Sequence, residues 1–149
     1  YYQKENTKGS PTMNTFIFSL LFVFSILAID FAVANVTVEV VEEGDGPEVT
    51  KGHQYSSQVT LYIENDDGST TPSGWSTRKK DGAKEETTFE FQPGRNLIQG
   101  WTEGVLQMKE GERAKLHVPS ALGYGDRPMG APGGAFYIPA NSNLLFDIK

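Results

Sequence analysis

The side chains that most often carry out chemistry in enzymes are scarce in this sequence. It contains no cysteine and only two histidines, His53 and His117, so thiol nucleophiles, disulfides, zinc ribbons and multi-histidine metal centres are not expected. Phosphate-binding and dinucleotide-binding glycine motifs are absent, and the acidic turn at residues 65–68 does not fit a calcium loop. Ser76 and Ser120 have no base close to them in the sequence. We therefore expect a function that needs no acid, base, nucleophile, cofactor or metal.

Aromatic residues are the most distinctive chemical feature of the chain. They are Tyr62, Phe89, Phe91, Trp101, Tyr124, Phe136, Tyr137 and Phe146. The simplest interpretation is a hydrophobic core, and we favour it for Phe91. Several of the others lie in glycine- and proline-rich segments, residues 122–125 and 136–139, which are typical of surface loops. Aromatic side chains on such loops predict a concave apolar pocket for a small or extended ligand.

Alternation of apolar and polar residues indicates the strands that must position these aromatics. The alternating segments are residues 36–40, 55–63, 89–91, 114–118 and 144–148. Within residues 55–63, Val59 and Leu61 fall on one face, and Thr60 and Tyr62 fall on the other. Residues 69–86 are polar and charged apart from Trp75, so we interpret them as a long loop or a bulged edge strand.

A single helix is predicted over residues 96–108. Ile98, Trp101, Val105 and Met108 recur at i, i+3, i+7 and i+10, which forms one apolar stripe. Asn96 is the expected N-terminal cap, and Gly111 follows the C-terminal end. Gly100 and Gly104 would allow this helix to approach a sheet closely.

Length and composition limit the architecture and the class of partner. The chain has 149 residues, 16 glycines and 8 prolines, which indicates one turn-rich domain. We predict the α+β class, with a curved antiparallel sheet of about five strands wrapped on one short helix. The net charge of −6 argues against nucleic-acid binding. We expect the mature protein to be a monomer that does not bind membranes.

The N-terminal residues have the pattern of a targeting segment. Met13 is followed by an apolar run, residues 16–29, that is shorter than the roughly 20 residues a membrane-spanning helix needs. Asp30 and the small-residue site Ala32-Val33-Ala34 follow. We interpret residues 13–34 as a secretory signal peptide, cleaved after Ala34, with a signal anchor or a buried core helix as alternatives. Residues 1–12 are then a leader or non-native flank, and residues 35–149 form a domain located in the ER lumen or secreted.

The second half of the chain resembles a known family. The runs LIQGW (97–101), EGV (103–105) and GERAKL (111–116), with Met108, are similar to the central signature of FKBP-type peptidyl-prolyl cis–trans isomerases. The runs ALGYG (121–125), IPAN (138–141) and LLFDI (144–148) resemble the tyrosine flap and the last strand of that family. The resemblance covers essentially residues 36–149.

The resemblance implies a substrate pocket with Trp101 as its floor. The implied walls and further substrate contacts are Tyr62, Phe89, Leu97, Ile98, Ile138, Phe146, Tyr137 and Trp75. The Tyr124 hydroxyl and the Ile98 backbone N–H would anchor substrate carbonyl groups. One departure concerns the Phe-Asp-Ser-Ser run of the family, because the corresponding residues 72–78 contain Trp75 and no aspartate. The implied ligands are proline-containing polypeptides and macrolides.

The implied reaction suits a pocket without acid–base groups. Rotation of an X–Pro bond must overcome roughly 18–20 kcal/mol because it breaks amide resonance. The twisted amide has less charge separation than the planar one, so a dry aromatic pocket favours it relative to the planar form. An FKBP-like binding module that grips prolyl or apolar segments without turnover is the main alternative. A carrier of small ligands is a further one.

Overall fold

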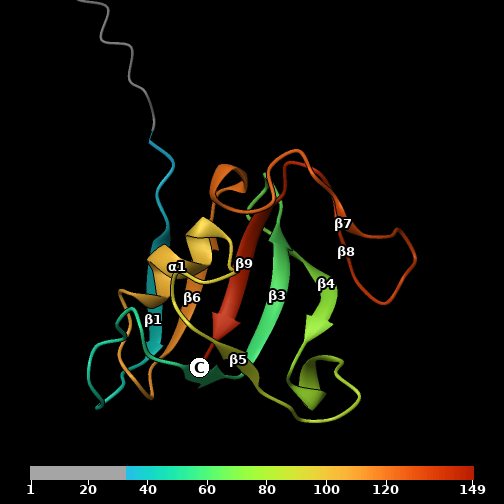
Figure 1. The fold of residues 1–149 in the computed structure, drawn as a ribbon. Helices are drawn as coiled ribbons and strands as arrows, with labels where there is room; N and C mark the ends of the chain where they lie inside the picture. The colour runs from blue at the N-terminus through green and yellow to red at the C-terminus, as the bar shows by residue number, and fades with distance from the viewer. Residues whose placement is uncertain (1–32) are drawn as a thin grey trace, which may run out of the picture. The chain divides into compact units, whose positions relative to one another are not determined.

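The structure is a computed structural model that describes residues 33–149. The predicted leader and almost all of the predicted signal peptide lie outside the described residues. The main feature of the described part is a five-stranded antiparallel sheet with the order β1–β6–β9–β3–β4 (Figure 1). The strands are β1 (Thr37–Glu42), β3 (Val59–Glu64), β4 (Thr70–Ser76), β6 (Arg113–Val118) and β9 (Asn143–Ile148). Helix α1 (Gln99–Val105) packs on one face of this sheet, which confirms the predicted fold class.

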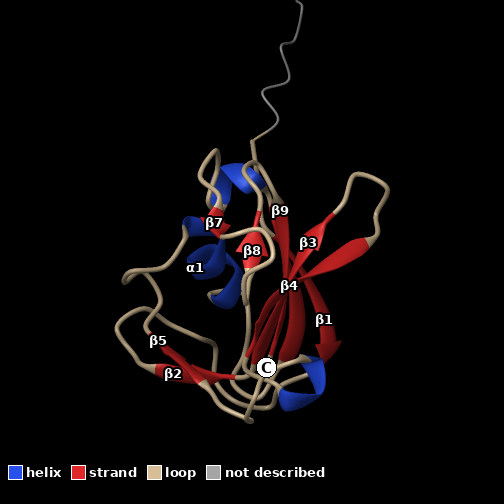
Figure 2. Cartoon of the chain, turned by 90° about the vertical axis from the view of Figure 1, so that its right-hand side faces the viewer, coloured by secondary structure: helices blue, strands red, loops and turns tan. Residues whose placement is uncertain are grey.

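The remaining elements are short and lie around the sheet. Strand β2 (Tyr55–Ser57) pairs with β5 (Phe89–Phe91), and β7 (Met129–Gly130) pairs with β8 (Tyr137–Ile138). Figure 2 shows the β2–β5 pair apart from the main sheet. Two 3₁₀ turns, η1 (Lys79–Asp81) and η2 (Ser120–Leu122), complete the described elements. No helix within residues 33–149 has the length and apolar character needed to cross a membrane.

Two strand predictions are corrected by this arrangement. The segment 55–63 is two strands, because the residues before Gln58 pair with β5 whereas those after it pair with β9. Residues 89–91 therefore lie outside the main sheet, and β4 forms its fifth strand at the edge. Register between β3 and β4 shifts between Thr60 and Tyr62, so the bulged-edge-strand interpretation is correct for residues 70–76. Alternation reveals a half-buried strand but does not identify its partner.

Helix α1 is shorter than predicted at both ends. Asn96 has a left-handed backbone (φ 54°), so it belongs to the preceding turn, and Ile98 occupies the N-cap position without a side-chain cap. At the other end, Gln107 and Met108 donate to carbonyl groups only three residues back, which ends the α-helical pattern. The predicted apolar stripe nevertheless faces the core, since Trp101, Val105 and Met108 are buried.

The close approach of α1 to the sheet is confirmed at its two glycines. A Cβ atom on Gly100 would overlap Val118, and one on Gly104 would lie 2.8 Å from Leu116 Cδ1. Strand β6 alternates strictly between partly buried and buried positions, so Leu116 and Val118 both point at the helix side of the sheet. The helix therefore lies directly over β6.

Candidate functional site

An apolar hollow of about 320 Å³ lies where α1, the sheet and the segment containing β7 and β8 meet. Below, the segment of residues 126–138 is called the flap. The hollow is lined by Leu61, Trp75, Phe89, Asn96, Leu97, Ile98, Trp101, Tyr124, Met129, Phe136, Ile138 and Phe146. None of these side chains is charged. The site can therefore hold an uncharged, largely apolar group and shield it from water.

Trp101 forms the centre of this site. Its side chain extends from α1, is only 3% exposed, and is surrounded edge-on by other rings. The ring centroids of Phe89, Phe91 and Phe146 lie 5.4, 5.5 and 5.0 Å from the indole, with interplanar angles of 75–85°. Edge-to-face contacts of this kind hold aromatic rings in fixed orientations. The indole is thus a rigid floor.

Most of the site residues predicted from the sequence are brought together here. Those that line the hollow are Trp75, Phe89, Leu97, Ile98, Trp101, Tyr124, Ile138 and Phe146. They come from β4, β5, α1 with the turn before it, the segment just after η2, β8 and β9. Elements far apart in the sequence therefore converge on one hollow.

Tyr62 does not belong to this group, so its prediction as a pocket wall is wrong. It follows Leu61 on β3, and Leu61 lines the hollow opposite Phe146. Successive side chains on a strand point to opposite faces, which puts Tyr62 on the other side of the sheet. There, burial and then the negative charges of Asp81 and Asp147 raise the pKa of Tyr62. The alternation within residues 55–63 already grouped Leu61 with the core residue Val59. This grouping was the sequence signal that could have identified Leu61, rather than Tyr62, as the wall residue.

The flap contributes residues that the sequence prediction did not assign to the site. Met129 and Phe136 line the hollow, whereas Tyr137 between Phe136 and Ile138 does not. One glycine allows the flap to approach the sheet closely, and another allows the two sides of the flap to approach each other. A Cβ atom on Gly74 of β4 would overlap the carbonyl oxygen of Ala135, and one on Gly130 would overlap that of Phe136. Through Met129, Phe136 and Ile138, the flap therefore forms one side of the hollow.

Trp75 supplies the aromatic side chain that the segment 72–78 was expected to provide. Its ring meets Phe89 edge-on at 5.7 Å. The next residue, Ser76, hydrogen-bonds to Thr60 and to the Arg78 backbone on the opposite face. No aspartate lines the hollow, which agrees with the absence of one from residues 72–78.

Two polar groups are available at the rim. Burial raises the pKa of Tyr124, so its hydroxyl stays protonated and can donate a hydrogen bond at neutral pH. The Ile98 N–H, at the start of α1, makes no hydrogen bond to the described part of the chain. Both groups are donors, and both suit carbonyl oxygens of a bound ligand.

A second hollow of about 380 Å³ lies at the other end of the described domain, between β2, the turn before β6 and the end of β9. Its lining includes Lys109, Glu110 and Glu112, and its two aromatic residues are Tyr55 and Phe91. It contains none of the predicted site residues. Among residues 33–149, no group of three acidic or histidine side chains is arranged to hold a metal ion. The hollow over Trp101 is therefore the candidate site.

Comparison with known proteins places these features in context. The sequence profile of the FKBP-type peptidyl-prolyl cis-trans isomerase family matches residues 46–149. FK506-binding protein 1 of Gibberella zeae is 36% identical over 125 residues, covering 77% of this chain and 95% of that protein. FK506-binding protein of Neisseria meningitidis serogroup A is 33% identical over 115 residues, covering 77% of this chain and 93% of that protein. The crystal structure of AtFKBP13 superimposes with a TM-score of 0.60 at 29% identity, covering 76% of this chain and 89% of that one.

Proposed function

This chain belongs to the FKBP-type peptidyl-prolyl cis-trans isomerase family, and on that premise we propose how and where it accelerates rotation about X–Pro bonds. The proposed site is the hollow over Trp101, and the proposed substrates are proline-containing polypeptides. The observation that carries this proposal is the absence of charge from the hollow combined with the buried indole floor. A proline ring is apolar and fits an apolar hollow, whereas the adjoining amide must lose water to enter it.

Loss of water is the proposed source of catalysis. The planar amide is stabilised by resonance that separates charge, and water solvates that charge. An uncharged aromatic hollow solvates the planar form poorly, so the twisted form is favoured relative to it. A millionfold acceleration requires about 8 kcal/mol of such differential stabilisation. No proton transfer is needed, which agrees with a lining that has no charged side chain.

Two donors orient the substrate in this proposal. The Tyr124 hydroxyl and the Ile98 N–H bind carbonyl oxygens on either side of the rotating bond. Leu61, Phe89, Ile138 and Phe146 provide the walls, and Trp75, Leu97, Met129 and Phe136 contact the neighbouring residues of the substrate. Tyr137 is not included, since it does not line the hollow.

The Trp101→Leu variant tests the proposed site. Leucine fills part of the volume but removes the flat ring, so we expect kcat/KM for a Leu-Pro or Phe-Pro peptide to fall by about tenfold or more. We expect the variant to stay folded, with a loss of about 1–3 kcal/mol in the free energy of unfolding. A protease-coupled isomerisation assay measures the rate, and circular dichroism checks folding.

Tyr62→Phe is the matched control because Tyr62 lies on the opposite face of β3. Its kcat/KM should equal that of the wild type. A folded Trp101→Leu variant with wild-type activity would show that the indole is not the floor of the catalytic site. A wild-type rate equal to the uncatalysed rate would remove the catalytic proposal.

A non-catalytic binding module is the second candidate function. It is favoured by the absence of an aspartate from residues 72–78 and from the hollow. Binding of a proline peptide, measured by tryptophan fluorescence, without any acceleration of its isomerisation would select this function. Because several relatives are named FK506-binding proteins, we also propose that the same hollow binds macrolides of the FK506 type.

We propose that the protein acts in the secretory pathway, in the ER lumen or after secretion. The support comes from the sequence of residues 13–34, which lies almost entirely outside the described part of the structure. Expression of the full chain in a secreting eukaryotic cell should release a product whose N-terminal residue is Asn35. Retention of residues 13–34 in the product would contradict cleavage.

A further inference from the structure

A third hollow adjoins the proposed catalytic site. It measures about 390 Å³ and shares Phe89, Asn96 and Leu97 with the lining of the site. The two hollows therefore border each other at these three residues. A polypeptide whose proline occupies the first hollow must extend over its rim, and this neighbouring hollow offers one route for the flanking residues.

The lining of the neighbouring hollow differs from that of the site in polarity. Its remaining residues are Gln54, Glu90, Phe91, Gln92 and Arg95, so they combine two amide side chains and two charged ones with one ring. This hollow suits polar residues that flank the proline of a substrate. The apolar proline ring suits the uncharged hollow over Trp101 instead. This difference makes the hollow a separate subsite.

Arg95 is the only cationic residue of this lining. Its Nη1 donates a hydrogen bond to Gln92 Oε1 at 3.1 Å, and its guanidinium forms no ion pair with any carboxylate in residues 33–149. By contrast, Arg78 and Arg113 are both paired with Asp147. Arg95 therefore has donors free for a ligand, and its planar fork can bind a carboxylate through two of them.

The backbone holds Arg95 at the junction of the two hollows. The Arg95 N–H donates to the Gln92 carbonyl at 3.0 Å, which closes a turn that contains Gly94 at φ 86°. Asn96 follows in a left-handed conformation, and α1 begins shortly after it. A turn defined by a hydrogen bond and two unusual backbone angles has little freedom to move away from the site.

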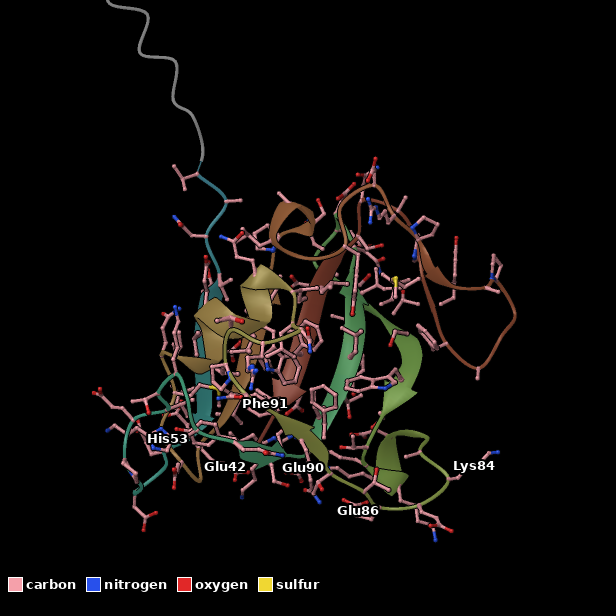
Figure 3. All side chains as sticks on the ribbon, in the orientation of Figure 1. Glu42, His53, Lys84, Glu86, Glu90 and Phe91 are labelled. Carbon is pink, nitrogen blue, oxygen red and sulfur yellow. The ribbon has the colours of Figure 1, made fainter. Side chains whose placement is uncertain are left out.

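Glu90 is the one opposing charge in the lining. Its neighbours Phe89 and Phe91 stack at 6.3 Å on the inner side of β5, so the Glu90 side chain points outward from the core. Figure 3 labels Glu90 and Phe91 on this strand. The Glu90 carboxylate accepts a hydrogen bond from Thr88 at 3.1 Å, and it forms no ion pair with Arg95.

We propose that this hollow is a subsite for residues flanking the proline and that Arg95 makes it select an acidic side chain. The inference rests on the proposed function, because it places the proline over Trp101. The preferred substrate is then a polypeptide with a glutamate or aspartate within a few residues of the proline, on the one side of the proline that leads to Arg95.

The test compares neutral and acidic peptides in matched pairs. Each pair carries Phe-Pro with glutamate or glutamine at one position, up to three residues before or after the proline. We expect the preference only when the acidic residue lies on one side of the proline, either before it or after it. On that side, kcat/KM for the glutamate peptide should be about two- to fivefold higher than for the glutamine peptide, as for an exposed ion pair. The preference should weaken as salt is raised from low to physiological concentration and beyond.

Variants assign the preference to a residue. Arg95→Gln should reduce the glutamate-to-glutamine ratio to about one, and Glu90→Gln should increase it because it removes a repulsive charge. Arg127→Gln is the matched control: Arg127 is an exposed arginine of the flap that does not line either hollow, so it should leave the ratio unchanged. Circular dichroism confirms that each variant is folded.

The possible outcomes separate this inference from the proposed function. Acceleration of both peptides at equal rates would overturn the acidic subsite and leave the isomerase proposal standing. A ratio that survives in Arg95→Gln would also overturn it, because another residue would then recognise the acid. If neither peptide is accelerated, the isomerase proposal fails, and peptide affinities measured by tryptophan fluorescence decide whether Arg95 selects acidic ligands.

Discussion

At the scale of single residues, Trp101 lies at the centre of the proposed site, although burying its indole N–H destabilises the fold. Its indole N–H is buried and makes no hydrogen bond to the described part of the chain. A buried donor without a partner costs about 1–3 kcal/mol. Phenylalanine has no such donor, but its smaller ring would leave space among the rings that surround the indole. The larger indole fills this space and provides a broad, flat floor for the proposed site.

Removal of the Tyr124 hydroxyl tests the role of a single hydrogen bond in the proposed site. Tyr124→Phe removes one hydroxyl and leaves the ring in the hollow, so we expect a roughly fivefold loss of kcat/KM, corresponding to about 1 kcal/mol for one hydrogen bond. The free energy of unfolding should change little. A peptide isomerisation assay and urea denaturation measure the two quantities.

Tyr137→Phe makes the same chemical change on a flap residue that does not line the hollow. It should retain the wild-type kcat/KM. Equal kcat/KM in the wild type, Tyr124→Phe and Tyr137→Phe would mean that the Tyr124 hydroxyl does not anchor the substrate.

At the scale of secondary-structure elements, contact between β4 and the flap determines the shape of the hollow. Strand β4 carries Trp75 into one wall, and the flap carries Met129 and Phe136 into another. The two meet at Gly74, which has φ 86° and no space for a Cβ atom beside Ala135. A glycine in an edge strand usually weakens it, but here it permits the contact that closes the site.

The Gly74→Ala variant should separate these two elements. We expect the flap to move away from β4, the free energy of unfolding to fall by about 1–3 kcal/mol, and kcat/KM to fall with it. Hydrogen exchange of the flap amides should increase. Denaturation, kinetics and exchange measurements together test this expectation.

Gly68→Ala is the control for backbone strain alone. Gly68 also has a positive φ of 79°, but nothing lies within 4 Å of its Cβ position. It should lose less stability than Gly74→Ala, because only the backbone strain applies, and it should keep the wild-type flap exchange. Similar flap exchange in Gly68→Ala and Gly74→Ala would show that the contact with Ala135 does not hold the flap.

At the scale of the whole described domain, an ion network on the opposite face of the sheet joins its edge to its centre. Arg113 makes two hydrogen bonds to Asp147, at 2.9 and 2.8 Å, and Arg78 lies 3.0 Å from the same carboxylate. Arg78 is 3% exposed and lies two residues after the end of β4. Its Nη2 also donates to the Gln58 carbonyl. The network thus ties the end of β4, and through it the wall containing Trp75, to β9.

This network predicts a component of acid unfolding. Burial acts to raise the pKa of Asp147, but the hydrogen bonds and positive charges of Arg113 and Arg78 outweigh it and lower the pKa below the ordinary 3.8. The folded state therefore binds fewer protons than the unfolded one near this pH. The stabilisation that ionised Asp147 gives the folded state is complete above about pH 5, and it is lost as the pH falls through 4 and below.

Asp147→Asn should remove this pH dependence and destabilise the protein at pH 7 by about 3 kcal/mol, because Arg78 would remain buried without its partner. Urea denaturation between pH 3 and 7 measures both effects. Asp126→Asn, an exposed carboxylate of the flap, is the control and should change neither. A parallel pH profile for Asp147→Asn and wild type would contradict the assignment.

The aromatic residues, the strands and the position of the helix follow from local patterns in the sequence. Alternation identified the strand segments because a half-buried strand exposes every second side chain. The stripe of Trp101, Val105 and Met108 identified the buried face of the helix for a similar reason. The resemblance of residues 36–149 then led to most of the side chains that line the hollow.

Long-range geometry decided the remainder. The sequence shows that Leu61 and Tyr62 lie on opposite faces of a strand, but only pairing with β9 determines which of them meets Trp101. Contact between Gly74 and Ala135, and the union of Arg78 with Asp147, join residues that are distant in sequence and carry no shared local pattern. The left-handed backbone at Asn96 likewise depends on how the turn from β5 must enter α1. Local patterns set the character of each element, whereas packing between elements determines which side chains form the site.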